Sequence, residues 1–237
     1  MQLILLSAGR GSRLSKELRS KPKSLVKVNN KPIIEHNLKF FNKFKKKFIV
    51  TGYKQKSLVS FAKKYGFKMV YNSKFQKTNM VYSMFLPSKY ITKDVVICYG
   101  DIIFDHKIYN LLIKKDNIIP LNINWLKIWK KRMSKKNIKK DAENVLVKNN
   151  ILLSIGVKIN KDFPKYQYMG IFKLKRNIYL NLKKFFVKIK NPKIDMTNFL
   201  NTSIKHCNLK LKIKKYQSYW YEIDNKKDLI VSSKDLK

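Results

Sequence analysis

The sequence predicts an α/β fold in which helices cover both faces of a mostly parallel central sheet. Two observations lead to this prediction: short apolar runs alternate with helix-like stretches, and hydrophobic residues make up 44% of the 237 positions. Alternating strands and helices favour parallel strands that are buried on both faces. The apolar content excludes a disordered chain. Because no uncharged apolar run reaches about 18 residues, no transmembrane segment is expected.

Strands are expected in the first half where short apolar runs are bounded by turn or polar residues. These runs are Gln2–Ser7, Phe48–Thr51, Lys68–Tyr71 and Val95–Tyr99. Helices are expected between them at Pro32–Phe44, which has proline in its first turn, and at Gln55–Tyr65, which Gly66 follows. Ligands of such sheets bind at the carboxyl ends of the strands. The residues that follow each strand are therefore the first candidates for a site.

The second half of the chain has a less regular pattern. Asn144–Lys148 and Ile151–Ile155 predict a hairpin across two asparagines. Further strands are expected within Tyr166–Leu174 and Leu209–Tyr216, and helices at Asn177–Ile189 and Met196–Lys205. Since no linker rich in proline, glycine or serine divides the chain, we expect a single domain over residues 1–237.

The charge of the chain is strongly basic, with 54 Lys+Arg against 14 Asp+Glu and a net charge of +40. Only five of the basic residues are arginine, and the lysines are spread over nearly every segment. This pattern favours solvated surfaces over a groove for nucleic acid, in which arginine is usual. No specific nucleic-acid partner is therefore expected. Two cysteines and no recognisable signal peptide indicate a reduced, cytoplasmic protein.

A loop of small residues, Ser7–Leu14, follows the first strand directly. Glycines at this place let backbone N–H groups approach a phosphate chain, and Arg13 adds positive charge. Lys23, in the next segment, brings a second cation to the same anion. A P-loop is excluded because its Gly-Lys-Ser/Thr ending is absent. A dinucleotide fingerprint is excluded because its third glycine and its acidic residue are absent.

Three segments together carry a family resemblance: Leu-Ser-Ala-Gly-Arg-Gly-Ser-Arg-Leu at 6–14, Lys-Pro-Lys-Ser-Leu-Val at 21–26 and Lys-Pro-Ile-Ile-Glu-His at 31–36. They resemble the nucleotidyltransferase signature of the nucleotide-diphospho-sugar transferase superfamily. The resemblance implies a Rossmann-like, GT-A-like fold with a smaller β-rich acceptor-binding part. It also implies a nucleotide-binding half of about residues 1–115 and an acceptor-binding half of about 116–237.

Two aspartates are candidate metal ligands. Asp101 follows the strand Val95–Tyr99, and a carboxylate at a strand end suits Mg²⁺. The segment Tyr219–Asp224 resembles the second metal segment of the family. The resemblance therefore implies Asp101 and Asp224 as Mg²⁺ ligands and, together with Arg13 and Lys23, as the catalytic residues. Asp224 has an alternative role as the cap of a helix that begins near residue 225.

The base-binding residues are expected in Thr78–Met84, which resembles the Asn-x-x-x-Ser-Leu segment of small cytidylyltransferases, including those acting on phosphocholine. The resemblance implies CTP as the nucleotide. The nucleotide-binding residues that it implies are Leu6, Ala8, Gly9, Gly11, Arg13, Lys23, Asn79, Ser83 and Gly100.

The acceptor is expected to be a small phosphorylated or phosphonate compound. Asp141–Val145, Gln167–Ile171 and Asp195–Thr197 resemble cytidylyltransferases acting on 2-aminoethylphosphonate and related phosphonates. The candidate acceptor-binding residues are Glu143, Tyr168, Asp195 and Trp220. An acid among them could hold an ammonium group, and an aromatic ring could stack on it. Asp195 has an alternative role as the N-cap of the helix that follows it.

The segment 125–140 is not explained by the resemblance. Its tryptophans fall at helical spacing among eight basic residues, which suits either a basic helix on a membrane or a pocket wall whose aromatic face packs on the core. Two alternatives to a cytidylyltransferase stay open: a sugar-1-phosphate nucleotidyltransferase, and a basic protein that binds nucleic acid or a membrane surface. The sequence also leaves a homodimer open.

Overall fold

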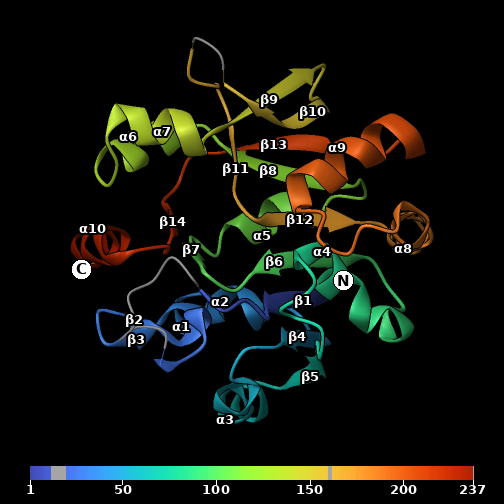
Figure 1. Cartoon of the computed structure of the whole chain (residues 1–237), viewed down its shortest axis with the longest axis horizontal. Coiled ribbons are helices and arrows are strands. Elements are labelled where there is room, and N and C mark those ends of the chain that lie inside the picture. The colour runs from blue at the N-terminus through green and yellow to red at the C-terminus, as the bar shows by residue number, and fades with distance from the viewer. Residues whose placement is uncertain (12–19, 160–161, 237) are drawn as a thin grey trace.

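The central sheet of the molecule is mixed, with a parallel core and helices on both faces (Figure 1). The computed structural model describes residues 1–11, 20–159 and 162–236. Within them, ten strands form one sheet in the order β5-β4-β1-β6-β12-β8-β13-β10-β9, and β11 pairs with β8. The strands are β1 (Gln2–Ser7), β4 (Lys47–Thr51), β5 (Phe67–Tyr71), β6 (Val95–Tyr99), β8 (Ile118–Asn122), β9 (Glu143–Lys148), β10 (Ile151–Lys158), β11 (Gln167–Tyr168), β12 (Ile171–Leu174) and β13 (Lys212–Tyr216).

The helices lie around this sheet, and two small ladders lie beside it. The ladders pair β2 (Lys27–Val28) with β3 (Lys31–Pro32), and β7 (Ile102–Phe104) with β14 (Trp220–Glu222). The α-helices are α1 (Ile33–His36), α2 (Leu38–Phe41), α3 (Val59–Lys64), α4 (Met80–Phe85), α5 (Ile108–Leu112), α6 (Trp125–Lys130), α7 (Lys135–Asp141), α8 (Arg176–Ile189), α9 (Met196–Cys207) and α10 (Lys226–Asp235). Short 3₁₀ helices are η2 (Lys23–Leu25), η3 (Gln55–Leu58) and η4 (Leu86–Tyr90).

The parallel core confirms the predicted fold class. β1 pairs in parallel with β4 and β6, and all six of its residues are buried. A strand that is apolar on both faces is stable only between two covering layers. The sheet departs from a purely parallel one where β12 enters antiparallel to β6 and β8.

The predicted helix over Pro32–Phe44 is wrong in its length, because the structure divides it at Asn37 into α1 and α2. The Asn37 side chain is buried and donates a hydrogen bond to the Ile102 carbonyl at 2.7 Å. It also accepts one from the Phe104 N–H at 3.2 Å. The side chain thus provides hydrogen-bond partners for backbone groups of β7. The helix is interrupted at the residue that makes these contacts.

The predicted hairpin is confirmed, since β9 and β10 pair antiparallel. Asn149 and Asn150 both have positive φ, at 51° and 58°, as a two-residue hairpin turn requires. The expected strand Tyr166–Leu174 is divided into β11 and β12 at residues 169–170, and Gly170 has φ 75°. A Cβ at this glycine would lie 2.6 Å from the Tyr99 ring.

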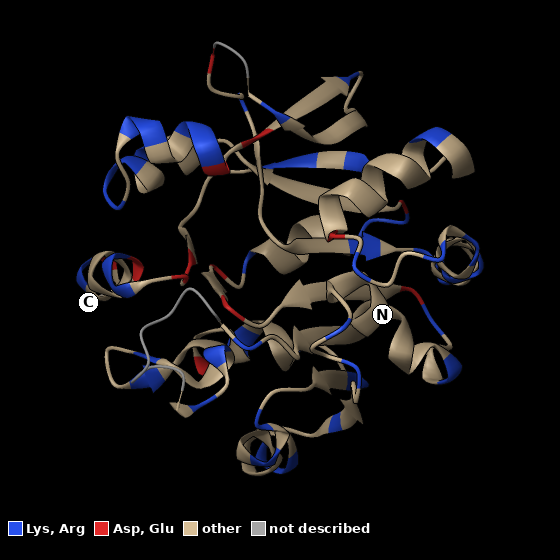
Figure 2. Ribbon diagram, viewed as in Figure 1, with Lys and Arg blue, Asp and Glu red and all other residues tan. Residues whose placement is uncertain are grey.

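The segment 125–140 forms two helices, α6 and α7, whose tryptophans pack into the core. Trp125 and Trp129 are 1% and 4% exposed, while the lysines of both helices, blue in Figure 2, are exposed. This burial favours the pocket wall over the membrane-bound helix. Among the residues that the structure describes, no helix is both long and apolar enough to cross a bilayer.

Candidate active site

The site is built at the carboxyl ends of β1 and β6, which lie side by side in parallel. The Gly100 N–H donates to the Leu6 carbonyl at 2.9 Å. A Cβ at Gly100 would lie 2.2 Å from Ser7 Oγ, so only glycine permits this approach. The close contact places Asp101 next to the loop that follows β1.

A cavity of about 320 Å³ opens above this loop, and a narrower one of about 120 Å³ lies beside it. All the predicted nucleotide-binding residues within the described ranges line one or both of them; Arg13 lies outside the described residues. The lining residues that match the prediction are Leu6, Ala8, Gly9, Gly11, Lys23, Asn79, Ser83 and Gly100.

Several polar side chains line the narrow cavity beside apolar ones, and they come from α4 and from the residue that follows β5. Asn79 is the N-cap of α4, and its side chain accepts from the Met80 N–H at 2.7 Å. Ser83 Oγ accepts from the Asn72 side-chain amide at 3.0 Å. Asn72 also lines this cavity and is missed by the sequence prediction. Its position directly after a predicted strand could have marked it.

Three carboxylates lie close together beside the cavity above the glycine loop. They belong to Asp101, Glu222 and Asp224, and each offers an oxygen within 4.8 Å of the others. The antiparallel ladder between β7 and β14 brings them together, because Glu222 pairs with Ile102. The Ile223 N–H then donates to the Asp101 carbonyl at 3.1 Å. Two segments more than a hundred residues apart therefore present their acids to one point.

Lys23 lies among these acids. Its Nζ donates to Asp101 Oδ2 at 2.6 Å and to Asp224 Oδ1. Burial alone would lower the pKa of Lys23, but the charges of Asp101 and Asp224 outweigh it and raise the pKa above its ordinary value. The ammonium therefore stays protonated at neutral pH.

Glu222 is a further acid of this cluster that the sequence prediction misses. Burial, followed by the neighbouring charges of Asp224 and Asp101, raises its pKa to about 7. Its place in the Tyr-Glu-Ile-Asp run was visible in the sequence. What marks it as a site residue is its pairing across to β7, which the sequence alone does not indicate.

The cluster fits a divalent cation. Asp101 Oδ1 is buried and has no hydrogen-bond partner among the described residues, and hard oxygen donors are the ligands that Mg²⁺ prefers.

The capping alternative for Asp224 is wrong, because Asn225 is the cap of α10. Its side chain accepts from the Lys227 and Asp228 N–H groups.

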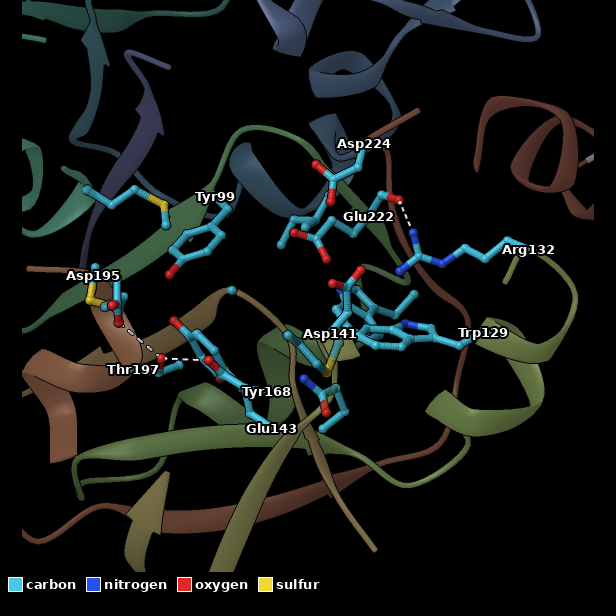
Figure 3. Close-up of a pocket in the computed structure, with 17 residues that line it drawn as sticks. Tyr99, Trp129, Arg132, Asp141, Glu143, Tyr168, Asp195, Thr197, Glu222 and Asp224 are labelled. Atoms are coloured by element: carbon cyan, nitrogen blue, oxygen red, sulfur yellow. Dashed lines mark hydrogen bonds between the residues drawn. The ribbon is translucent and has the colours of Figure 1, made fainter. Parts of the chain in front are cut away.

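A third cavity, of about 240 Å³, adjoins the carboxylates and contains all four predicted acceptor-binding residues (Figure 3). Glu143 accepts from Thr197 Oγ1 at 2.9 Å, and burial raises the pKa of its carboxyl. Asp195 accepts from the Asn198 N–H at 2.8 Å. The capping alternative for Asp195 is therefore confirmed, although the residue also lines the cavity.

The walls of this cavity are acidic and aromatic. The rings of Tyr99 and Tyr168 meet edge to face at 5.9 Å, and those of Trp129 and Trp220 stack at 6.1 Å. Of the described residues that line the cavity, Arg132 is the one Lys or Arg. The acids that line it are Asp141, Glu143, Asp195, Glu222 and Asp224. This concentration contrasts with the net charge of +40 over the whole chain. Arg132 is not predicted from the sequence as a site residue.

Asp224 lines both the cavity above the glycine loop and the acidic cavity, so two bound molecules could meet at one carboxylate cluster. Transfer of a nucleotidyl group between two substrates requires such an arrangement. Fold and site together define a nucleotidyltransferase.

Comparison with known proteins agrees with this class. Residues 3–117 match the model of the MobA-like NTP transferase domain. The chain is 31% identical to CTP:phosphoglutamine cytidylyltransferase of Campylobacter jejuni, over 98% of each chain. It is 32% identical to choline-phosphate cytidylyltransferase of Streptococcus pneumoniae, over 46% of this chain and 49% of that one. The chain belongs to this nucleotidyltransferase family and is cytidylyltransferase-like.

Solved structures show the same fold. CTP:phosphocholine cytidylyltransferase from Streptococcus pneumoniae superposes with a TM-score of 0.78 at 21% identity, covering 100% of this chain and 99% of that one. The inositol-1-phosphate CTP transferase from T. maritima has a TM-score of 0.78 at 20% identity, covering 98% and 95%. Members of the nucleotidyltransferase family typically need a divalent metal.

Proposed function

We propose that the protein transfers CMP from CTP to a small phosphorylated or phosphonate acceptor and releases pyrophosphate, in a Mg²⁺-dependent reaction. The observation that carries the proposal is the position of Asp224, which lines both the cavity above the glycine loop and the acidic cavity. In this arrangement residues 1–115 bind the nucleotide and residues 116–237 bind most of the acceptor. A phosphate held in the acidic cavity would lie beside the same carboxylates as the triphosphate.

The chain's own residues would bind and orient the two anions. The loop glycines, Arg13 and Lys23 hold the triphosphate, and Asp101, Asp224 and Glu222 hold Mg²⁺. The bound cation supplies charge neutralisation at the transferred phosphate. No general base is needed, since an acceptor phosphate with a second pKa of about 6 is mostly dianionic at neutral pH. The protein's contribution is then alignment and electrostatic stabilisation.

CTP is the proposed nucleotide because Asn79 and Ser83 lie at a narrow cavity of about 120 Å³. A smaller base fits such a slot better than a purine. The similarity to CTP:phosphoglutamine cytidylyltransferase adds support, since that relative aligns over 98% of the chain.

The acceptor is proposed to carry an ammonium group next to its phosphate or phosphonate. The acids of the cavity would attract the cation, and Tyr168 and Trp220 would supply aromatic faces to it. Buried polar atoms without partners among the described residues, Gln167 Oε1 and Trp220 Nε1, belong to the same wall. Such atoms ordinarily have a hydrogen-bond partner, and polar groups of the bound acceptor substrate would supply one. Phosphocholine, phosphoglutamine and 2-aminoethylphosphonate all carry a nitrogen group of this kind.

The test is pyrophosphate release from CTP, UTP, ATP and dTTP with phosphocholine, phosphoglutamine, 2-aminoethylphosphonate and glucose 1-phosphate. We expect turnover with CTP and an ammonium-bearing acceptor, and its loss on chelation of divalent metal. Turnover with glucose 1-phosphate alone would replace the proposal with a sugar-1-phosphate nucleotidyltransferase. Salt-sensitive DNA binding without any turnover would indicate a nucleic-acid-binding protein instead.

A further inference from the structure

Arg132 connects the segment between α6 and α7 to the carboxylate cluster. Its side chain is 6% exposed, and Nη1 lies 2.8 Å from Asp228 Oδ1, itself 1% exposed. Nη1 also donates to the Glu222 carbonyl at 3.2 Å, the contact drawn as a dashed line in Figure 3. The guanidinium lies over the Trp129 ring, 4.8 Å from its centroid. The side chain is therefore held at a fixed position beside β14.

The second oxygen of Asp228 holds the other end of the same segment. Asp228 Oδ2 accepts from the Asp224 N–H at 2.7 Å and from the Asn225 N–H at 3.0 Å. Arg132 thus binds the carbonyl of residue 222, while its partner Asp228 binds the N–H of residue 224. The pair spans the three residues that carry two of the clustered carboxylates.

A buried ion pair is a weak source of stability, because apolar residues of similar volume often serve as well. The carboxylates of Glu222 and Asp224 also repel each other and Asp101. Backbone anchors at residues 222 and 224 would hold them together against this repulsion. Mutating groups that orient metal ligands in this way typically costs about 10- to 100-fold in metal affinity or activity.

We propose that Arg132 and Asp228 are positioning residues that fix segment 222–224 so that its two carboxylates face Asp101. The family signature does not explain the segment 125–140. In this proposal the segment has a function, because it places Arg132 beside the metal site. The inference rests on the proposed function, because it takes this cluster to be where the divalent cation binds.

The experiment measures Mn²⁺ binding to the metal-free, full-length protein by calorimetric titration, together with the melting temperature and the kinetic constants of CMP transfer. For Arg132→Met we expect roughly a 10- to 100-fold loss of Mn²⁺ affinity. We also expect kcat to fall more than the KM for CTP rises. Lys131→Met is the matched control, since Lys131 is exposed and pairs at 2.7 Å with Asp235 of α10, which is not one of the three clustered acids. It should bind Mn²⁺ like the parent.

A double variant, Arg132→Met with Asp228→Asn, separates positioning from stability. It removes both charges of the pair, so the melting temperature should recover toward that of the parent, while Mn²⁺ affinity stays at least about tenfold weaker. Recovery of both quantities, or unchanged Mn²⁺ affinity in a folded Arg132→Met protein, would overturn the inference. A parent protein that binds no Mn²⁺ would overturn it as well. A parent that binds Mn²⁺ but releases no pyrophosphate would overturn the proposed function alone.

Discussion

Lys23 Nζ lies 2.6 Å from Asp101 Oδ2, although 78 positions separate the two residues in the chain. The same ammonium contacts Asp224, which lies 201 positions away. The lysine expected to bind phosphate and the acids expected to bind metal therefore share one cluster. Any cation that these carboxylates bind must share them with Lys23 or displace its ammonium, so the protein's affinity for metal and its hold on the triphosphate are physically linked.

Asp101→Asn should nearly abolish turnover while the fold stays intact. The substitution removes a charge at a strand end without changing the shape of the side chain. Losing one interaction of this kind typically costs a few kcal/mol of transition-state stabilisation, roughly a hundredfold or more in rate. Steady-state pyrophosphate release measures the effect, and circular dichroism reports on folding. Near-normal turnover in a folded variant would remove Asp101 from the mechanism.

Lys23→Ala should lower kcat strongly, whereas Lys63→Ala should not. Lys23 lies at the carboxylate cluster and lines the same cavity as the glycine loop, whereas Lys63 is an exposed residue of α3. A contact that strengthens in the transition state lowers kcat when it is removed, while a uniform binding contact raises KM alone. Kinetics of both variants with saturating CTP provide the comparison. Equal, small effects would mean that the general lysine background supplies the positive field.

CTP should stabilise the protein against heat more than UTP, ATP or dTTP does, each with Mg²⁺ present. Binding to the folded state alone raises the melting temperature with ligand concentration. Asn79 and Ser83 line the narrow cavity on which this preference depends. If UTP or dTTP stabilises the protein and CTP does not, the sugar-nucleotide alternative takes precedence.

Glu222 should make the metal-free protein less stable as pH rises from about 4.5 to 7. Its pKa is raised from 4.5 to about 7 by burial and by Asp224 and Asp101. In this window the folded state binds more protons than the unfolded state, so the free energy of unfolding falls with rising pH. Urea unfolding of the parent and Glu222→Gln in the presence of a chelator tests this. The stability difference between them should shift in favour of the variant as pH rises, and a pH-independent difference would contradict the prediction.

Glu143→Gln should raise the KM for an ammonium-bearing acceptor by about tenfold, with kcat little changed at saturation. A tenfold change corresponds to about 1.4 kcal/mol, a reasonable loss for one charge contact. Glu35→Gln, on α1 away from the cavity, is the matched control. The same KM for both variants and the parent would place the ammonium elsewhere in the cavity.

Short sequence patterns correctly predicted the turns and strands whose conformation depends mainly on residues adjacent in the chain. The paired asparagines at 149 and 150 indicate a two-residue turn, and the structure gives both positive φ. The run Gln2–Ser7 is apolar on both faces and lies in the parallel core. Local patterns do not predict an element whose conformation depends on a distant partner. The sequence around Asn37 predicts one continuous helix, but the helix is interrupted at Asn37, whose side-chain amide forms hydrogen bonds with β7.

By itself, the sequence determined the parallel core, the glycine loop and the two aspartates, because hydrophobic periodicity and a family signature are properties of short segments. Only the tertiary structure decided that Glu222 joins those aspartates. It alone linked Arg132 to Asp228. These contacts join β7 to β14, and the segment between α6 and α7 to α10, and no local pattern records the register or packing of such distant elements.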